Sequence, residues 1–246
     1  MYHVEENMAK KHGKKYLEAA KKVDESKLYA PADAIRLVKE TSYTKFDGSV
    51  EVHLRLGIDP RQADQNIRST VALPHGTGKT VRVLVFAQGD AAVAAREAGA
   101  DFVGADELIA QIDRENFFDF DIAIATTDMM AKVGRVARKL GPRGLMPNPK
   151  SGTVVAGDDL ARTIKEVRGG RVEFRNDKTG LLHVAVGKVS FSDAQISENI
   201  ASLMESVKST KPSSIKGTFV RSVTFTSTMG PGIPVDPTAA QAMTTN

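Results

Sequence analysis

The chain has 246 residues, of which 41% are hydrophobic and 26% charged, a composition typical of a soluble globular protein. There is no cysteine, which excludes disulfides, thiolate ligands and thiol nucleophiles, and no apolar run reaches the roughly 18 residues of a membrane span. The sequence does not open with a signal-peptide pattern, and its net charge of +4 is compatible with a polyanionic partner.

Basic residues gather in two places, and each cluster fits a solvated helix face as well as it fits a polyanion-binding surface. The clusters are Lys10, Lys11, Lys14, Lys15, Lys21 and Lys22 near the start, and Lys132, Arg135, Arg138, Lys139, Arg143 and Lys150 in mid-chain.

The two ends of the chain predict half-buried strands. Residues 49–58 alternate apolar side chains with Glu51, His53 and Arg55, which gives a strand with one wet face. Residues 171–177, 180–189 and 218–227 predict further strands, and residues 192–209 predict a helix that begins at a capping box of Ser192 and Gln195. Residues 231–246 have no apolar periodicity, so we expect this segment to fray.

The middle of the chain predicts a different architecture. Residues 81–86 and 121–126 are almost continuously apolar, which is typical of strands covered on both faces. Helices are predicted over 90–99, over 106–116 with Asp106 as the cap, and over 130–140. Alternating strands and helices indicate a parallel sheet.

These patterns predict a discontinuous α+β domain, an antiparallel sheet with helices on one side, interrupted by a parallel-sheet, Rossmann-like α/β domain. The expected boundaries are 1–75 plus 170–246 for the first domain and 76–169 for the inserted one. Two Gly-rich segments, residues 73–79 and 167–171, lie where the chain must cross between them. We expect Gly76, Gly78, Gly169 and Gly170 to supply permissive backbone at these hinges.

The segment LPHGTGKT (73–80) resembles the end of a phosphate-binding loop, but the pattern fails. The first glycine of G-x-x-x-x-G-K-[ST] is replaced by Leu73, Pro74 removes one N–H donor, and Thr80 leads into a predicted strand rather than a helix. We interpret the segment as a connector with an exposed Lys79. A nucleotide-dependent enzyme stays the alternative that Lys79→Ala would test.

Other catalytic patterns are missing from the sequence. The five histidines (His3, His12, His53, His75 and His183) lack metal-ligand spacing, and there is no G-x-S-x-G. Asp119 and Asp121 are explained by turn and strand-end roles. We therefore expect no enzyme activity, no cofactor and no metal.

Three remaining segments suggest contact with nucleic acid. Residues 141–154 (GPRGLMPNPKSGTV) form a stiff basic loop, residues 175–180 (RNDKTG) a turn between strands, and residues 227–232 (STMGPG) a turn of hydroxyls and glycines. Aromatic residues are only 6% and tryptophan is absent, which favours structured RNA over base stacking on single strands. A basic adaptor that binds any polyanion is a further alternative.

Together with LPHGTGK, YTKFDGSVEVHLRLGID and FVRSVTFTSTMGP, these motifs closely resemble the bacterial large-subunit ribosomal protein L-one family, over roughly residues 10–235. The resemblance implies a two-domain, monomeric, cytoplasmic protein of the large ribosomal subunit. It also implies binding to the rRNA stalk, assistance in releasing deacylated tRNA from the exit site, and repression of the protein's own operon mRNA.

Carried over by motif, the resemblance implies RNA contacts at Lys45, Phe46, Glu51, Arg175, Asp177, Lys178, His183, Ser222, Thr228, Met229 and Gly230. Lys178 and Arg175 would contact phosphates, and Thr228 and Ser222 would contact 2′-hydroxyls or base edges. Phe46 and Met229 would pack on sugars or bases. Arg143 and Lys150 would form a second rRNA or tRNA contact.

Overall fold

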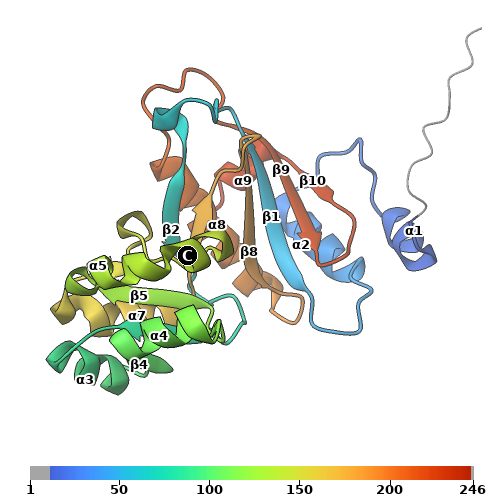
Figure 1. Cartoon of the computed structure of the whole chain (residues 1–246). Coiled ribbons are helices and arrows are strands. Elements are labelled where there is room, and N and C mark those ends of the chain that lie inside the picture. The colour runs from blue at the N-terminus through green and yellow to red at the C-terminus, as the bar shows by residue number, and fades with distance from the viewer. Residues whose placement is uncertain (1–11, 245–246) are drawn as a thin grey trace, which may run out of the picture.

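The computed structural model describes residues 12–244, which form two lobes (Figure 1). One lobe holds an antiparallel sheet from the two ends of the chain, and the other holds a parallel sheet from its middle. The predicted fold class is therefore confirmed. None of the helices within residues 12–244 is long and apolar enough to cross a membrane.

The antiparallel sheet has the order β10-β9-β1-β8, with bounds Ser49–Leu56 (β1), Leu181–Lys188 (β8), Val220–Ser227 (β9) and Ile233–Val235 (β10). In β1, Val50, Val52 and Leu54 are fully buried. Burying each such side chain contributes about 1.5–3 kcal/mol, and this fixes which residues face the core. The intervening residues of β1 consequently lie on the opposite face of the sheet.

Helices pack against the apolar face of this sheet. They are α2 (Pro31–Glu40), α8 (Asp193–Ser209) and α9 (Pro237–Gln241). A further helix, α1 (Lys14–Ala20), comes before them in the chain. Helix α8 begins at the predicted capping box: the Gln195 N–H donates to Ser192 Oγ at 3.2 Å, and the Ser192 N–H donates to Gln195 Oε1 at 2.9 Å. The opposite face is open to solvent. We call it the open face: Glu51, His53, Arg55, His183, Ala185, Ser222, Thr224 and Thr226.

A two-stranded antiparallel ribbon connects the lobes. Its strands are β2 (Arg68–Ala72) and β7 (Arg171–Arg175), and they are paired from Arg68 opposite Arg175 to Ala72 opposite Arg171. The Leu73 N–H continues the pairing by donating to the Gly170 carbonyl at 3.2 Å. The sequence predicted β7 but not β2.

The parallel sheet has the order β4-β3-β5-β6, with bounds Val83–Phe86 (β3), Phe102–Gly104 (β4), Ile122–Thr126 (β5) and Val154–Val155 (β6). Its helices are α3 (Asp90–Glu97), α4 (Asp106–Arg114), α5 (Met130–Val133), α6 (Ala137–Leu140) and α7 (Leu160–Arg168). All four residues of β3 are fully buried, and they divide between two separate apolar cores. The prediction of strands covered on both faces is therefore confirmed.

The expectation that residues 231–246 fray is wrong for the described part of this segment. Ile233 and Val235 are buried in β10, which pairs with β9, and Ala240 of α9 is fully buried. Strand β10 is the last strand of the sheet, and the Pro234 carbonyl accepts from the Tyr29 N–H at 3.0 Å on the side away from β9. The missing N–H of Pro234 therefore costs no hydrogen bond to β9. Asp236 caps α9 by accepting from the Thr238 N–H at 2.8 Å.

Two helix predictions also need correction. Asp106 is the first residue of α4 rather than its cap, and Ala105 occupies the cap position without a side-chain hydrogen bond. The helix predicted over 130–140 is divided into α5, a 3-10 turn from Gly134 to Val136, and α6. Gly134 lowers helix propensity at the break. In the N-terminal basic cluster, Lys10 and Lys11 lie outside the described residues, as does His3.

Candidate nucleic-acid interface

One end of the open face is formed by the 227–230 turn and the loop that precedes β1. The Ser49 N–H donates to Thr228 Oγ1 at 2.8 Å, and the Thr228 N–H donates to the Ser49 carbonyl at 2.9 Å. The Tyr43 hydroxyl donates to the Met229 carbonyl at 2.7 Å. These contacts hold Met229 in the left-handed region with φ +65°, a conformation that few non-glycine residues adopt.

Two large apolar side chains are exposed at this end. Met229 is 67% exposed and Phe46 is 61% exposed, and Lys45 beside Phe46 is also exposed. Gly230 approaches the preceding Ser227 so closely that an added Cβ would overlap Ser227 Oγ. The cost of holding exposed Met229 in a strained backbone conformation favours a binding role for this end of the open face.

The centre of the open face is set by strand register. Glu51 lies opposite Ala185 and Thr226, His53 lies opposite His183 and Thr224, and Arg55 lies opposite Leu181 and Ser222. Because β1 is eight residues long, this face extends for about 23 Å along the strand. A patch of that length, with one row of hydroxyls and one of ionisable groups, can contact several successive nucleotides.

The other end of the open face is the 175–180 turn. Asp177 accepts hydrogen bonds from the Leu181 N–H, the Thr179 N–H and Thr179 Oγ1, each at about 2.8 Å. The backbone hydrogen bond from Leu181 is the main reason that the pKa of Asp177 is lowered. The carboxylate of Asp177 therefore shapes the turn, and this leaves Arg175 and Lys178 exposed as its cationic groups.

The 175–180 turn is joined to the ribbon through Asn176. Its Oδ1 accepts from the Ile67 N–H at 2.6 Å, and its Nδ2 donates to Asn66 Oδ1 at 3.1 Å. A hollow of about 590 Å³ lies between the turn and the ribbon, and its lining includes Glu173, Lys178 and His183.

The eleven residues predicted to bind RNA thus lie on, or at the two ends of, the open face. Their contact with RNA stays a prediction. Sequence reasoning did not include His53, Arg55 and Thr224, which lie on the same face. The alternation in β1 already indicated His53 and Arg55, since residues two apart in a strand lie on the same face of the sheet.

Arg143 and Lys150 lie away from this set, on the inserted lobe. The Arg143 guanidinium stacks over the Phe118 ring, 3.8 Å from its centroid. The Lys150 N–H donates to Asn148 Oδ1 at 2.8 Å, while its side chain belongs to an exposed residue. Their role as a second RNA contact stays a prediction.

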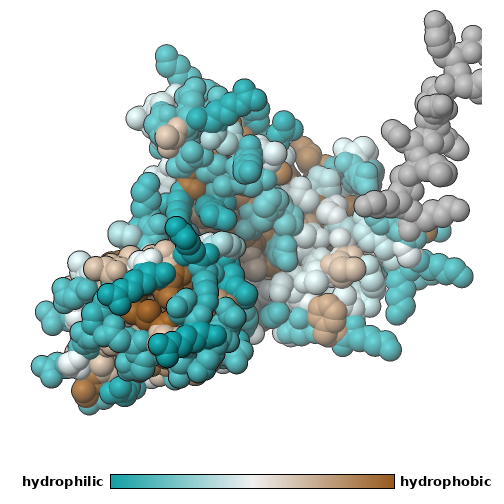
Figure 2. Space-filling view, viewed as in Figure 1, coloured by the Kyte–Doolittle hydropathy of each residue, from teal (hydrophilic) through white to brown (hydrophobic). Residues whose placement is uncertain are grey.

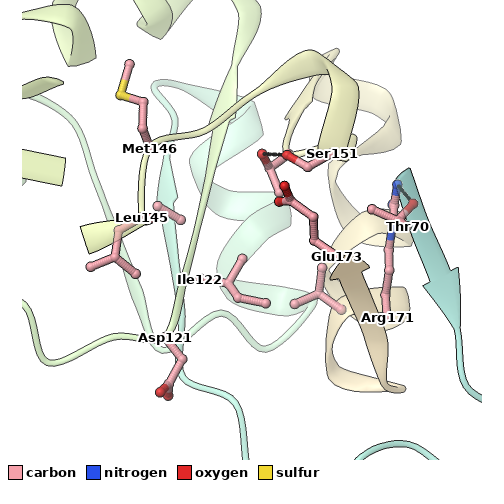
Figure 3. A pocket seen from close by; sticks show the side chains of 12 residues that line it. Thr70, Asp121, Ile122, Leu145, Met146, Ser151, Arg171 and Glu173 are labelled. Carbon is pink, nitrogen blue, oxygen red and sulfur yellow. Dashed lines mark hydrogen bonds between the residues drawn. The ribbon is translucent and has the colours of Figure 1, made fainter. Parts of the chain in front are cut away.

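The 141–154 loop lies against the ribbon. A cavity of about 180 Å³ lies between the two segments. Figure 3 shows that Thr70, Arg171 and Glu173 of the ribbon line it, together with Leu145, Met146 and Ser151 of the loop. Arg171 donates to Glu166 at 3.1 Å and to Thr70 Oγ1 at 3.3 Å. In the view of Figure 2 the surface of the inserted lobe is mainly hydrophilic around a hydrophobic patch. The surface of the other lobe is largely of intermediate hydropathy, and the molecule is hollowed between the lobes.

The two crossings of the chain touch each other through glycines. Gly76 has φ +64° and Gly170 has φ +108°, both in a region that L side chains rarely adopt. A Cβ added to Gly170 would overlap the Gly76 Cα. Gly78, with φ +70°, lies against Lys188 and Phe191, whereas Gly169 has a helical conformation at the end of α7. Three of the four predicted hinge glycines therefore have conformations that favour glycine; their function as hinges stays a prediction.

A buried asparagine fixes the first crossing to α8. Asn199 is fully buried; it accepts from the His75 N–H at 3.0 Å and donates to the carbonyls of Gly76 at 2.9 Å and Val186 at 2.7 Å. The His75 ring also contacts Glu198, with 2.5 Å between Nε2 and Oε2. Asn199 was not identified from the sequence, because a polar residue within a helix gives no sign of its partners.

Lys79 is more than an exposed connector residue. Its Nζ lies 2.6 Å from Asp121 Oδ1, and Asp121 also accepts from the Arg82 N–H at 3.1 Å. The hydrogen bond from Lys79 is the main reason that the pKa of Asp121 is lowered. The lysine of the GTGKT segment therefore supports the entrance of β5, and Thr80 is followed by β3 rather than by a helix.

Within residues 12–244, no three or more His, Asp or Glu side chains are grouped so that they could hold a metal ion.

Comparison with known proteins gives consistent matches. Residues 38–231 match the Ribosomal protein L1p/L10e family. Proteins called large ribosomal subunit protein uL1 are similar over 231 residues, 94% of this chain. Those of Chloroflexus aurantiacus and Chloroflexus aggregans are 75% and 76% identical over 98% of their own length, and that of Thermobifida fusca is 54% identical over 97%.

Proposed function

Because this chain belongs to the Ribosomal protein L1p/L10e family, we propose that its open face binds a folded stalk region of large-subunit rRNA. The protein is a structural, non-enzymatic constituent of the large ribosomal subunit, so the family resemblance drawn from the motifs is confirmed. We place it with that subunit in the cytoplasm.

The observation that carries the proposal is the composition of the open face and of its two ends. Exposed cations (Lys45, Arg55, Arg175, Lys178) and exposed apolar side chains (Phe46, Met229) accompany a row of hydroxyls on β9. Cations neutralise phosphates, hydroxyls can pair with 2′-hydroxyls, and apolar groups pack on sugars and bases.

The finer functions are part of the same proposal. A folded mRNA that presents the same backbone geometry as the stalk would compete for the open face, which supports repression of the protein's own operon. Arg143 and Lys150 on the inserted lobe would supply a second contact, to exit-site tRNA or to rRNA. We propose that the protein is a monomer when it is free of the ribosome.

We also propose the domain division given above, 1–75 plus 170–246 and 76–169, with the hinge at residues 73–79 and 167–171. The support is that the crossings consist of the two-stranded ribbon and the contact between Gly76 and Gly170. Such a narrow link allows one lobe to move relative to the other.

Filter binding of a stalk-rRNA fragment tests the proposal. Lys178→Ala is expected to weaken binding several-fold and to reduce the slope of log K against log salt by about one unit, because one phosphate contact is lost. Lys165→Ala is the matched control, since Lys165 is an exposed lysine on α7 of the inserted lobe. It should leave affinity and slope unchanged.

Competitor RNAs and DNA separate the proposal from a basic adaptor. An adaptor would bind duplex DNA, single strands and the stalk fragment equally, whereas the open face should prefer the stalk fragment over an unrelated structured RNA. Absence of binding at moderate salt, or equal loss in the Lys165→Ala control, would refute the assignment of RNA binding to this face.

A further inference from the structure

Two histidines face each other in the middle of the open face. His53 on β1 and His183 on β8 are directly paired across the sheet, and their Nδ1 atoms lie 2.8 Å apart. Two N–H groups, or two lone pairs, would repel at that distance. One Nδ1 therefore carries a proton and donates a hydrogen bond to the lone pair of the other Nδ1. The protonation states of the two rings are therefore coupled.

The coupling determines what the pair presents to a ligand. With both rings neutral, the ring that donates from Nδ1 has a lone pair on Nε2, so the pair presents a single Nε2–H donor. One added proton goes to that Nε2 and leaves the bond between the Nδ1 atoms intact. The pair then presents two Nε2–H donors and one positive charge. A second proton would place N–H groups on both Nδ1 atoms and break the bond.

A ligand can reach both rings. The side chain of His53 is 28% exposed and that of His183 is 51% exposed. His53 Nε2 lies 3.7 Å from Glu51 Oε2, and His183 Nε2 lies 3.9 Å from Asp177 Oδ2. Both separations exceed hydrogen-bond distance, so neither carboxylate occupies an Nε2 position.

The surrounding charges are mixed. Arg55 and Glu51 share the face of β1 with His53, while Thr224, opposite His53 on β9, is neutral. Arg175, Asp177 and Lys178 of the turn, and Glu173 of the ribbon, line the hollow that His183 also lines. A phosphate entering this hollow brings an additional negative charge close to the rings.

We propose that the pair of His53 and His183 is a proton-dependent phosphate contact: RNA binds with uptake of one proton, and both Nε2–H groups donate to the RNA backbone. This inference rests on the proposed function, because it requires RNA on the open face. In the free protein, burial lowers the pKa of His53, and the adjacent His183 lowers it further, which favours the neutral pair. A bound phosphate favours the charged form.

The consequence is a linkage between pH and affinity. RNA binding raises the pKa of the pair, so affinity is greatest at low pH and decreases as pH rises from the pKa of the free pair toward that of the bound pair. One linked proton gives at most a tenfold change in Kd per pH unit.

The test is the Kd of the full-length protein for the stalk-rRNA fragment, measured from pH 5.5 to 8.5 at constant ionic strength. Calorimetry in buffers of different ionisation enthalpy gives the number of protons taken up. Wild type is expected to lose affinity several-fold per pH unit near neutrality and to take up close to one proton. His53→Gln and His183→Gln should each abolish this slope, and the double variant should behave as the single ones do. His75→Gln is the control, because His75 lies at the first crossing beside Glu198, and it should keep the slope.

The outcomes separate the two proposals. Binding that is independent of pH in wild type, or an unchanged slope in His53→Gln, overturns the imidazole contact and leaves RNA binding standing. Absence of stalk-RNA binding at every pH overturns the proposed function and this inference with it. If a glutamine variant does not fold, the ¹⁵N chemical shifts of the wild-type imidazoles test the proposal instead. One ring is expected to become protonated when RNA is added, and rings that stay neutral would overturn the proposal.

Discussion

Replacing Asn199 by alanine is expected to lower the free energy of unfolding by about 3 kcal/mol. Asn199 is fully buried, and its side chain makes the three hydrogen bonds to His75, Gly76 and Val186. Each bond contributes about 1 kcal/mol net, and backbone groups left buried without a partner add to the cost. For a total stability of 5–15 kcal/mol this is a large fraction.

Urea denaturation followed by circular dichroism measures this loss, because the chain has no tryptophan for fluorescence. Amide exchange at His75 should accelerate as well, since its acceptor is removed. Ser197→Ala, two residues earlier on α8 at a half-exposed position, is the control and should change stability by less than about 0.5 kcal/mol.

Asn199→Asp distinguishes hydrogen bonding from packing. Aspartate has nearly the same volume but places an oxygen, instead of an N–H donor, against two carbonyls. It should therefore be at least as destabilising as alanine. A milder effect than that of alanine would mean that packing dominates, and an alanine variant as stable as wild type would refute the reasoning.

Three further perturbations test other parts of the structure. Gly170→Ala combines a positive φ with overlap on the Gly76 Cα, so it should lower the free energy of unfolding, measured in urea, by several kcal/mol. Gly144→Ala is the control, because Gly144 has φ +73° and open space, and it should lower this free energy by only about 1 kcal/mol. Equal losses would refute the contact between the crossings. The lowered pKa of Asp121 contributes stability that is present above the unfolded pKa and is lost as pH falls through the folded one. Asp121→Asn should therefore show a shallower loss of unfolding free energy below about pH 4, and an unchanged acid transition would contradict this. Met229→Ala should reduce stalk-RNA affinity about tenfold in filter binding while changing stability by less than about 0.5 kcal/mol, because the side chain is 67% exposed; a stability loss without an affinity loss would contradict its role.

The sequence alone determined the two sheet types and the interruption of one by the other. The alternation in residues 49–58 and the almost continuous apolar runs at 81–86 and 121–126 are local patterns, and burial of hydrophobic side chains enforces them directly. The motifs also determined the family, since segments such as GPRGLMPNPK are specific without any knowledge of their contacts.

Tertiary structure decided what depends on residues far apart in the chain. Strand register brings His53 next to His183, 130 residues away, and forms the ribbon from β2 and β7. Chain crossing brings together the three contacts of Asn199 and the ion pair of Lys79 with Asp121. The order of residues 231–244 likewise depends on β9 as a pairing partner. Local patterns cannot specify these contacts, because each is stabilised by groups that only the folded chain brings together.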